Sequence, residues 1–229
     1  MLDTILKLAL NYLVIQMSII LFIAPFYWRY SRKHQHTNDA NLSLSQRLEY
    51  FFESKHANYL VFWWAFGEAI VWFVIPEFLL LLLIFMRIQK KRQLLLYDIY
   101  GTAVGTLIAY VIHLPQTWIL HLPYIKHGMI LQTKDWYDHL GILGLIYQPF
   151  SGVPYKVFTH LAADYHFFIP AFLLFAVIIR ISRYYIAYVI LKSIYPFLHK
   201  YVYHNYVPLF IVSSLIFSLL LFRVFSSFP

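Results

Sequence analysis

Long apolar runs separated by short polar segments constrain this chain more than any other feature. The first run, residues 8–28, carries no charged side chain and is long enough to cross a bilayer as a helix. Over the whole chain 61% of the residues are hydrophobic and 12% are charged, whereas a soluble domain has about 25% charged residues. One soluble core could not bury that much apolar surface. The sequence therefore predicts an all-α integral membrane protein.

The basic residues are grouped between the apolar runs. The chain has 18 Lys and Arg against 10 Asp and Glu, and two clear basic clusters lie at residues 29–33 and 87–92. The membrane potential and anionic lipids hold such clusters on the cytoplasmic side. We therefore expect a multi-pass protein of the cell's inner (plasma) membrane. No nucleic-acid-binding motif accompanies the positive charge, so no nucleic-acid partner is expected.

Chemistry that depends on cysteine, a metal or a cofactor has no support in the sequence. The chain has no cysteine, and its scattered histidines form neither an HExxH motif nor a dense His box. No P-loop or nucleophile-elbow motif is present. We expect no metal, no cofactor and no enzymatic activity.

The order of apolar runs and breaks predicts about four full transmembrane helices and two re-entrant helical hairpins. An N-terminal span (residues 1–30) precedes a polar cytoplasmic loop (31–56) with a short interfacial helix at 45–52. A core (57–191) and a C-terminal span (207–225) follow. Within the core we expect a hairpin at 57–86, a span at 94–114, an outer interfacial loop at 115–139, a hairpin at 140–168 and a span at 169–191. A polar turn is expected at 199–205. The two hairpins enter from opposite sides, as in inverted-repeat transporters whose substrate site lies at the midplane.

The first hairpin is predicted because one apolar run has basic residues at both ends. Residues 57–86 are interrupted by Gly67, Glu68, Pro76 and Glu77. A single crossing would place one basic flank outside, whereas a break near Pro76 and a return keep both flanks inside. Proline stops a helix because it lacks the backbone N–H donor. One long tilted helix with a proline kink is the alternative.

Glu68 and Glu77 are candidates for proton coupling. An ionisable side chain at membrane depth costs about 2.5–3.5 kcal/mol on insertion scales, so its presence indicates a function. A buried carboxyl group can exchange a proton near neutral pH. The structural alternative for Glu68 is that it caps a helix or pairs with a buried base.

The second hairpin has its own breaks and its own ionisable residues. Its breaks are expected at Pro149, Gly152 and Pro154. Lys156, His160 and Asp164 follow at a spacing of four, which places them on one face if this arm is helical. Lys156 could bind an anion, while His160 and Asp164 relay a proton. A self-neutralised polar strip without a function is the alternative.

Two residue pairs stand out in the full spans. Arg180 and Arg183 lie one helical turn apart, and the planar guanidinium group matches phosphate geometry, so both are assigned to substrate binding with Lys156. Gly101 and Gly105 form a GxxxG pattern, which lets a second helix approach closely. That helix could belong to this chain or to a second copy in a homo-oligomer.

These residues resemble the DedA family (SNARE-associated Golgi, or VTT, domain), and above all its YqaA-like branch. The most specific match is the stretch from Pro154 through Thr159, which reads P-Y-K-V-F-T, followed by Arg180 and Arg183. Glu68, Pro76-Glu77, Gly101 and Gly105 match the first half more loosely. The resemblance covers residues 59–188 and departs at Asp164, where the family has glycine. It also lacks the arginine-bearing second hairpin of other members, for which Lys156 is the nearest substitute.

The resemblance implies two facing re-entrant hairpins and the transport or flipping of anionic lipids. The expected cargo is a polyprenyl or phospholipid phosphate, with protons as the coupling ion. Two other functions stay open on the residues alone. One is a proton-coupled antiporter of a small soluble cation or drug, and the other is a membrane-organisation protein that transports nothing.

Overall fold

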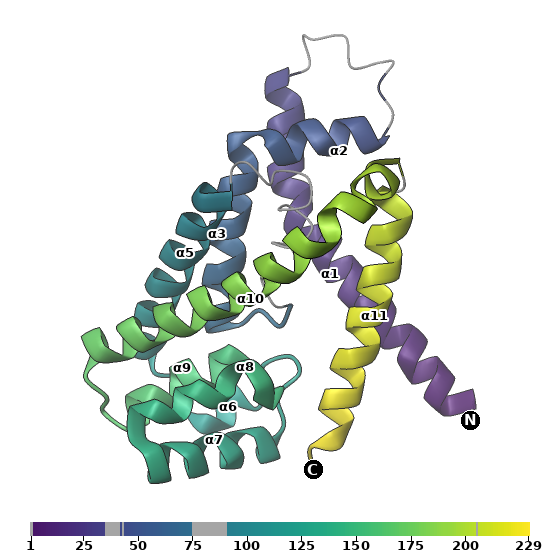
Figure 1. Cartoon of the computed structure of the whole chain (residues 1–229). Helices are drawn as coiled ribbons and strands as arrows, with labels where there is room; N and C mark the ends of the chain where they lie inside the picture. The colour runs from purple at the N-terminus through teal and green to yellow at the C-terminus, as the bar shows by residue number, and fades with distance from the viewer. Residues whose placement is uncertain (1, 35–41, 43, 75–90, 205) are drawn as a thin grey trace.

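The computed structural model describes residues 2–34, 42, 44–74, 91–204 and 206–229. Every regular element in these ranges is a helix, which confirms the all-α class. Figure 1 shows long helices α1, α5, α10 and α11 above and beside a group of short helices, α6 to α9.

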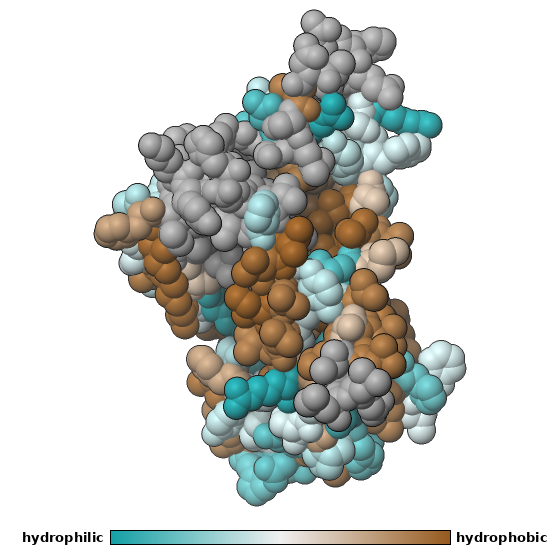
Figure 2. Space-filling model, turned by 90° about the vertical axis from the view of Figure 1, so that its right-hand side faces the viewer, coloured by the Kyte–Doolittle hydropathy of each residue, from teal (hydrophilic) through white to brown (hydrophobic). Residues whose placement is uncertain are grey.

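Among the residues that the structure describes, three helices are long and apolar enough to cross a membrane, so the chain is a multi-pass membrane protein. They are α1 (Leu2–His34), α5 (Lys91–Ile112) and α10 (Ile169–His204). Helix α11 (Tyr206–Ser227), at the position of the fourth expected span, has a shorter apolar stretch in its described part. Figure 2 shows the consequence on one face, where apolar residues form a brown band between hydrophilic ends.

Helix α10 is longer than the expected span of 169–191. It continues to His204 and has Pro196 inside it, so residues 199–204, expected in a polar turn, are helical.

The polar stretch after α1 contains a further helix, as expected. Helix α2 (Leu44–Glu53) lies across the upper ends of α1 and α3 in Figure 1. Phe51 is completely buried and its ring packs edge-on against Tyr27 and Tyr30 of α1. Ser54 then begins helix α3 (Lys55–Ile70), because its side chain accepts a hydrogen bond from the His56 N–H.

Among the described helices, α3 and α5 share the most extensive contact, and they lie side by side in Figure 1. The two glycines of the GxxxG pattern lie in this contact. A Cβ atom on Gly101 would stand 2.2 Å from the carbonyl oxygen of Phe62, and one on Gly105 would stand 2.7 Å from that of Phe66. The helix that approaches this pattern is thus α3 of the same chain.

Residues 115–139, expected to form an interfacial loop, are largely helical. They contain α6 (Gln116–Ile119) and most of α7 (His127–Leu140). The prediction missed them because α6 is one turn long and α7 has mixed polarity. One side of α7 is nevertheless apolar, and its Met129, Ile130 and Tyr137 are buried against the second hairpin region.

The second hairpin region consists of a 3₁₀ helix, η3 (Gly141–Tyr147), the short α8 (Gln148–Ser151) and α9 (Tyr155–Asp164). The chain turns between α8 and α9. Gly152 has a φ of 73°, which only glycine adopts freely, and Pro154 precedes the first residue of α9. Pro149 lies in the first turn of α8, where its missing N–H is not needed.

Candidate functional site

Helix α3 ends inside the protein, at the place where α9 reaches it. The N–H groups of Val71 and Trp72 both donate to the Gly67 carbonyl, at 2.8 and 2.6 Å, and the chain then leaves the helix. Helix α3, which was predicted to form the first arm of a hairpin, therefore ends at Ile70, several residues before Pro76. Pro76 and Glu77 themselves lie outside the described residues.

Lys156 of α9 binds the end of α3. Its side chain is buried, and Nζ donates to the carbonyl of Val71 at 2.9 Å and to that of Pro123 at 2.7 Å. The last carbonyls of a helix have no intrahelical donors and carry partial negative charge, so an ammonium group stabilises them. In this conformation Lys156 acts as a C-terminal cap for α3.

Two further side chains of α9 cap the same helix end. Thr159 donates to the Ala69 carbonyl at 2.7 Å, and His160 Nε2 lies 3.0 Å from the Ile70 carbonyl. Together with Lys156 they satisfy three consecutive backbone carbonyls by side chains of one neighbouring helix. An open helix end at membrane depth needs partners of this kind from protein or water. The end of α3 and helix α9 are thus held together by polar contacts.

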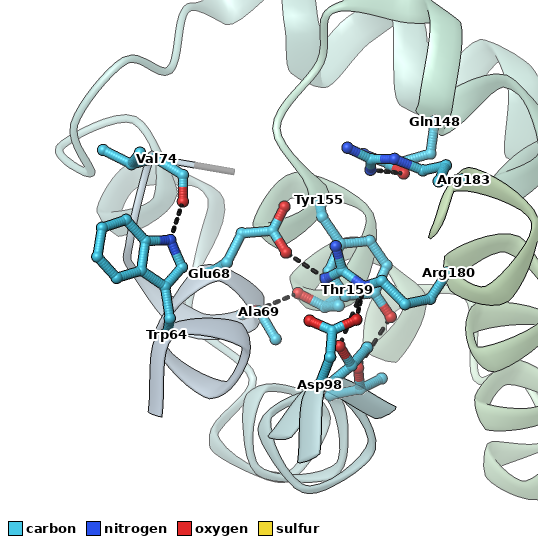
Figure 3. A network of polar contacts seen from close by, with 12 residues as sticks. Trp64, Glu68, Ala69, Val74, Asp98, Gln148, Tyr155, Thr159, Arg180 and Arg183 are labelled. Carbon is cyan, nitrogen blue, oxygen red and sulfur yellow. Dashed lines mark hydrogen bonds and ion pairs between the residues drawn. The ribbon is translucent and has the colours of Figure 1, made fainter. Parts of the chain in front are cut away.

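A buried ion pair lies next to this contact. Arg180 of α10 donates through Nη2 to Glu68 of α3, and its Nε lies 3.7 Å from a carboxylate oxygen of Asp98 on α5. The same Nε donates to Thr102 at 3.1 Å. The exposed fractions of these side chains are 4% for Arg180, 3% for Glu68 and 0% for Asp98. Figure 3 shows the guanidinium group of Arg180 between the two carboxylates.

Tyr155 links the ion pair to α9. Its ring lies 5.6 Å from the guanidinium carbon of Arg180, within the range of a cation–π contact. Its hydroxyl is 2.8 Å from that of Thr106 on α5. Side chains from α3, α5, α9 and α10 therefore meet in one buried polar cluster, which we call the central cluster: Glu68, Asp98, Thr102, Thr106, Tyr155 and Arg180.

Arg183 lies apart from the central cluster. Its Nη1 donates to the Gln148 side chain of α8 at 2.8 Å, and Figure 3 shows this pair apart from Glu68 and Arg180. Arg183 also lines a largely apolar groove between α10 and the η3–α8 segment, with Leu143, Phe150 and Ile178 among its walls. Arg180 and Arg183, which the sequence analysis assigned together to substrate binding, thus have different surroundings.

Asp164 is separated from Lys156 and His160, with which it shares the spacing of four. It lies at the end of α9, where Oδ1 is 2.5 Å from Nε2 of His113 and Oδ2 accepts from Gln116 at 3.3 Å. His113 terminates α5 in the left-handed region, with a φ of 45°. Asp164 therefore joins α9 to the end of α5 at a partly exposed position.

Asp98 and Tyr155 belong to the central cluster, but the sequence analysis did not select them as candidate site residues. Asp98 is an acidic residue within the apolar span expected at 94–114, so the rule that selected Glu68 would also have selected it. Tyr155 carried no signal of its own, because tyrosine is frequent throughout the chain. Among the described residues, no three His, Asp or Glu side chains converge as metal ligands would.

Removing the caps of α3 should destabilise the contact between α3 and α9. We expect Thr159→Val, which keeps the shape but loses the bond to Ala69, to cost about 1 kcal/mol. Lys156→Met leaves two carbonyls without their donor and should cost about 1–3 kcal/mol. Thermal unfolding in detergent measures both. Equal stability of Lys156→Met and the parent protein would show that the caps are dispensable.

The fold and the buried polar side chains define a helical multi-pass membrane protein with a cluster of ionisable side chains between its helices. No family model matches the chain, and no solved structure matches it. A protein of Haemophilus influenzae, which bears the name "Uncharacterized protein", is 27% identical over 139 residues. The match covers 57% of this chain and 71% of that protein. The likeness to the DedA family therefore stays a prediction.

Proposed function

We propose that this chain is a DedA-like transporter or flippase of the inner membrane, and that it moves an anionic lipid bearing a phosphate group. The observation that carries the proposal is Arg180, buried between Glu68 and Asp98 and beside the contact of α3 with α9. A permanent charge at this depth is costly to keep and is typical of a substrate or proton pathway.

Proton coupling follows from the charges of the central cluster and its neighbour Lys156. Glu68 and Asp98 face Arg180, and Lys156 is near enough to Glu68 to interact with it electrostatically. With every group ionised, the two acids balance the two bases. A proton bound by either acid leaves excess positive charge, which a lipid phosphate could then neutralise. Cargo and proton would thus enter the site together.

The apolar groove beside Arg183 suits the chain of such a lipid. Its walls are nearly all apolar, and Arg183 provides a cation at which a phosphate could bind. The central cluster is closed in this structure, since Arg180 is almost completely buried. Transfer from Arg183 to Arg180 would require α9 to move away locally from both α10 and α3. The caps on α3 are the contacts that would break and reform.

Transfer of a labelled polyprenyl or phospholipid phosphate across liposomes containing the purified protein tests this function. We expect Arg183→Gln to lower the initial rate at least about tenfold, because a charge-assisted hydrogen bond to phosphate is worth roughly 1.5–3 kcal/mol. The matched control is Arg223→Gln, an exposed arginine of α11 outside both the groove and the central cluster. A rate for Arg183→Gln equal to that of the control would count against the groove.

The pair of acids also allows an antiporter of a small cation, in which Glu68 and Asp98 bind the cargo directly. This second function predicts that Glu68→Gln abolishes transport of the cation and that Arg183→Gln merely weakens it. The lipid carrier predicts that both variants slow lipid transfer. If neither substrate crosses faster than in protein-free liposomes, the chain is not a transporter of these classes.

The re-entrant topology is part of the proposal and can be tested separately. The chain has no cysteine, so single cysteines can be introduced without interference. We expect Ser54→Cys and Gln89→Cys to react with an impermeant thiol reagent from the same side of the membrane. Gln116→Cys should react from the opposite side. If Ser54→Cys and Gln89→Cys were labelled from opposite sides, the segment between them would cross the membrane and the proposed hairpin would be wrong.

A further inference from the structure

A groove rich in positive charge lies between the last turns of α1 and the first turns of α3. It is distinct from the central cluster and from the groove beside Arg183, since it shares no lining residue with either. Figure 1 shows these two helix ends together at the top of the molecule, next to α2. We call it the basic groove, and its lining residues are Phe26, Arg29, Arg32, Lys33, His56, Tyr59 and Trp63.

The cations of the basic groove are concentrated by helical spacing. Arg29 lies three and four residues before Arg32 and Lys33, so all three lie on adjoining positions of one side of α1. The guanidinium group of Arg32 stacks on the Trp28 ring, with its central carbon 3.8 Å from the ring centroid. No carboxylate in the described part of the chain forms a salt bridge with these three residues.

Aromatic rings form the opposite wall of the basic groove. Tyr59 and Trp63 lie one turn apart on α3, and their exposed fractions are 51% and 47%. Tyrosine and tryptophan with one apolar and one polar side concentrate at the level of lipid headgroups. The exposed apolar surfaces of α1 continue from this level along the helix, at residues such as Leu21 and Met17.

We propose that the basic groove binds the phosphate headgroup of an anionic phospholipid. Three cations that form no salt bridge with a described carboxylate supply the charge that a phosphodiester needs, and Arg29 and Arg32 can each form a forked pair with phosphate oxygens. The rings of Tyr59 and Trp63 would pack on the glycerol and upper acyl region. Pockets of basic residues between membrane helices suit such headgroups. The bound lipid would join α1 to α3, and its binding does not depend on any transport by the chain.

Quenching of tryptophan fluorescence by brominated lipids tests the proposal, because Trp63 lines the groove. The full chain is placed in nanodiscs of phosphatidylcholine that contain brominated phosphatidylglycerol or brominated phosphatidylcholine. Both leaflets are accessible there, so the orientation of the protein has no influence. We expect the anionic lipid to quench with an apparent affinity at least about tenfold higher than the zwitterionic lipid. Trp63→Phe should remove most of this difference.

Two charge variants decide whether the basic groove or the overall charge of the protein causes the preference for the anionic lipid. The triple variant Arg29→Gln/Arg32→Gln/Lys33→Gln should remove the preference, so that the anionic and the zwitterionic lipid quench with about the same apparent affinity. The control Arg92→Gln/Lys192→Gln/Arg223→Gln removes the same charge at exposed positions outside the groove and should keep the preference. An equal loss in both variants would overturn the proposal, because it would show diffuse attraction only.

A soluble competitor separates a lipid headgroup from a free phosphate compound. Glycerol 3-phosphate at millimolar concentration should leave the lipid-dependent quenching unchanged, because it lacks the acyl region that the rings would contact. Full displacement by this compound would overturn the assignment to a lipid and would identify the groove as a site for a soluble phosphate. If Arg183→Gln lost transport but kept the lipid-dependent quenching, the basic groove would be a lipid site separate from the transport site.

Discussion

Arg180→Ala should destabilise the protein more than any other single change in the central cluster, by about 3–5 kcal/mol. Removing one partner of a buried ion pair leaves the other charge without compensation in a low-dielectric environment. Here two carboxylates, those of Glu68 and Asp98, lose the same cation. Reversible unfolding in SDS–detergent mixtures, followed by circular dichroism, gives the change in the free energy of unfolding.

The acidic partners should be less sensitive than the arginine. In Glu68→Gln the guanidinium group keeps Asp98, and in Asp98→Asn it keeps Glu68, so we expect each to cost less than half as much as Arg180→Ala. Arg183→Ala is the matched arginine control, since Arg183 bonds to the neutral Gln148 and should cost about 1 kcal/mol or less. If Arg180→Ala were no more costly than Arg183→Ala, the ion pair would have no part in holding the helices together.

Gly101→Ala should separate α3 from α5 and cost roughly 2–3 kcal/mol, although alanine favours a helix more than glycine does. The new methyl group would stand 2.2 Å from the Phe62 carbonyl oxygen and 3.0 Å from the carbonyl carbon. Both are backbone atoms, so a rotamer change cannot relieve the clash and one helix must move. The thermal unfolding midpoint in detergent measures the loss.

A second glycine provides the control for this change. Gly67 lies in α3, and a methyl group there would first meet the Trp72 Cβ at 3.4 Å, which is an ordinary contact. We expect Gly67→Ala to be neutral or to raise the midpoint slightly, since alanine is the better helix former. A similar fall in both variants would mean that the loss reflects glycine in general and not the contact between α3 and α5.

The DedA resemblance and the central cluster bear on different parts of the proposal. The resemblance suggests an anionic lipid as cargo, whereas the buried Arg180 with its two acids suggests a site whose charge a proton can change. Asp164 stands where the family has glycine, and here it holds His113 at the edge of the fold, away from the ion pair. The departure at Asp164 therefore leaves the central cluster intact.

Some parts of the site depend on contacts that no local pattern encodes. Lys156, His160 and Asp164 have helical spacing, yet only the packing of α9 against α3 directs the first two to backbone carbonyls. Arg180 and Arg183 are three residues apart, yet one faces the acids of α3 and α5 and the other faces Gln148. The end of α3 at Ile70 likewise coincides with the caps from α9, and no proline lies there.

The sequence by itself determined the class of protein and the positions of its main spans. Apolar residues in long runs have only lipid or other helices to contact, so composition and length were sufficient for α1, α5 and α10. Tertiary structure alone decided which buried charges meet. A hydrophobic run specifies depth in the membrane, whereas pairing across Glu68, Asp98 and Arg180 requires the crossing positions of three helices. Those positions come from close side-chain and backbone packing, such as that at Gly101, and from no single segment of the chain.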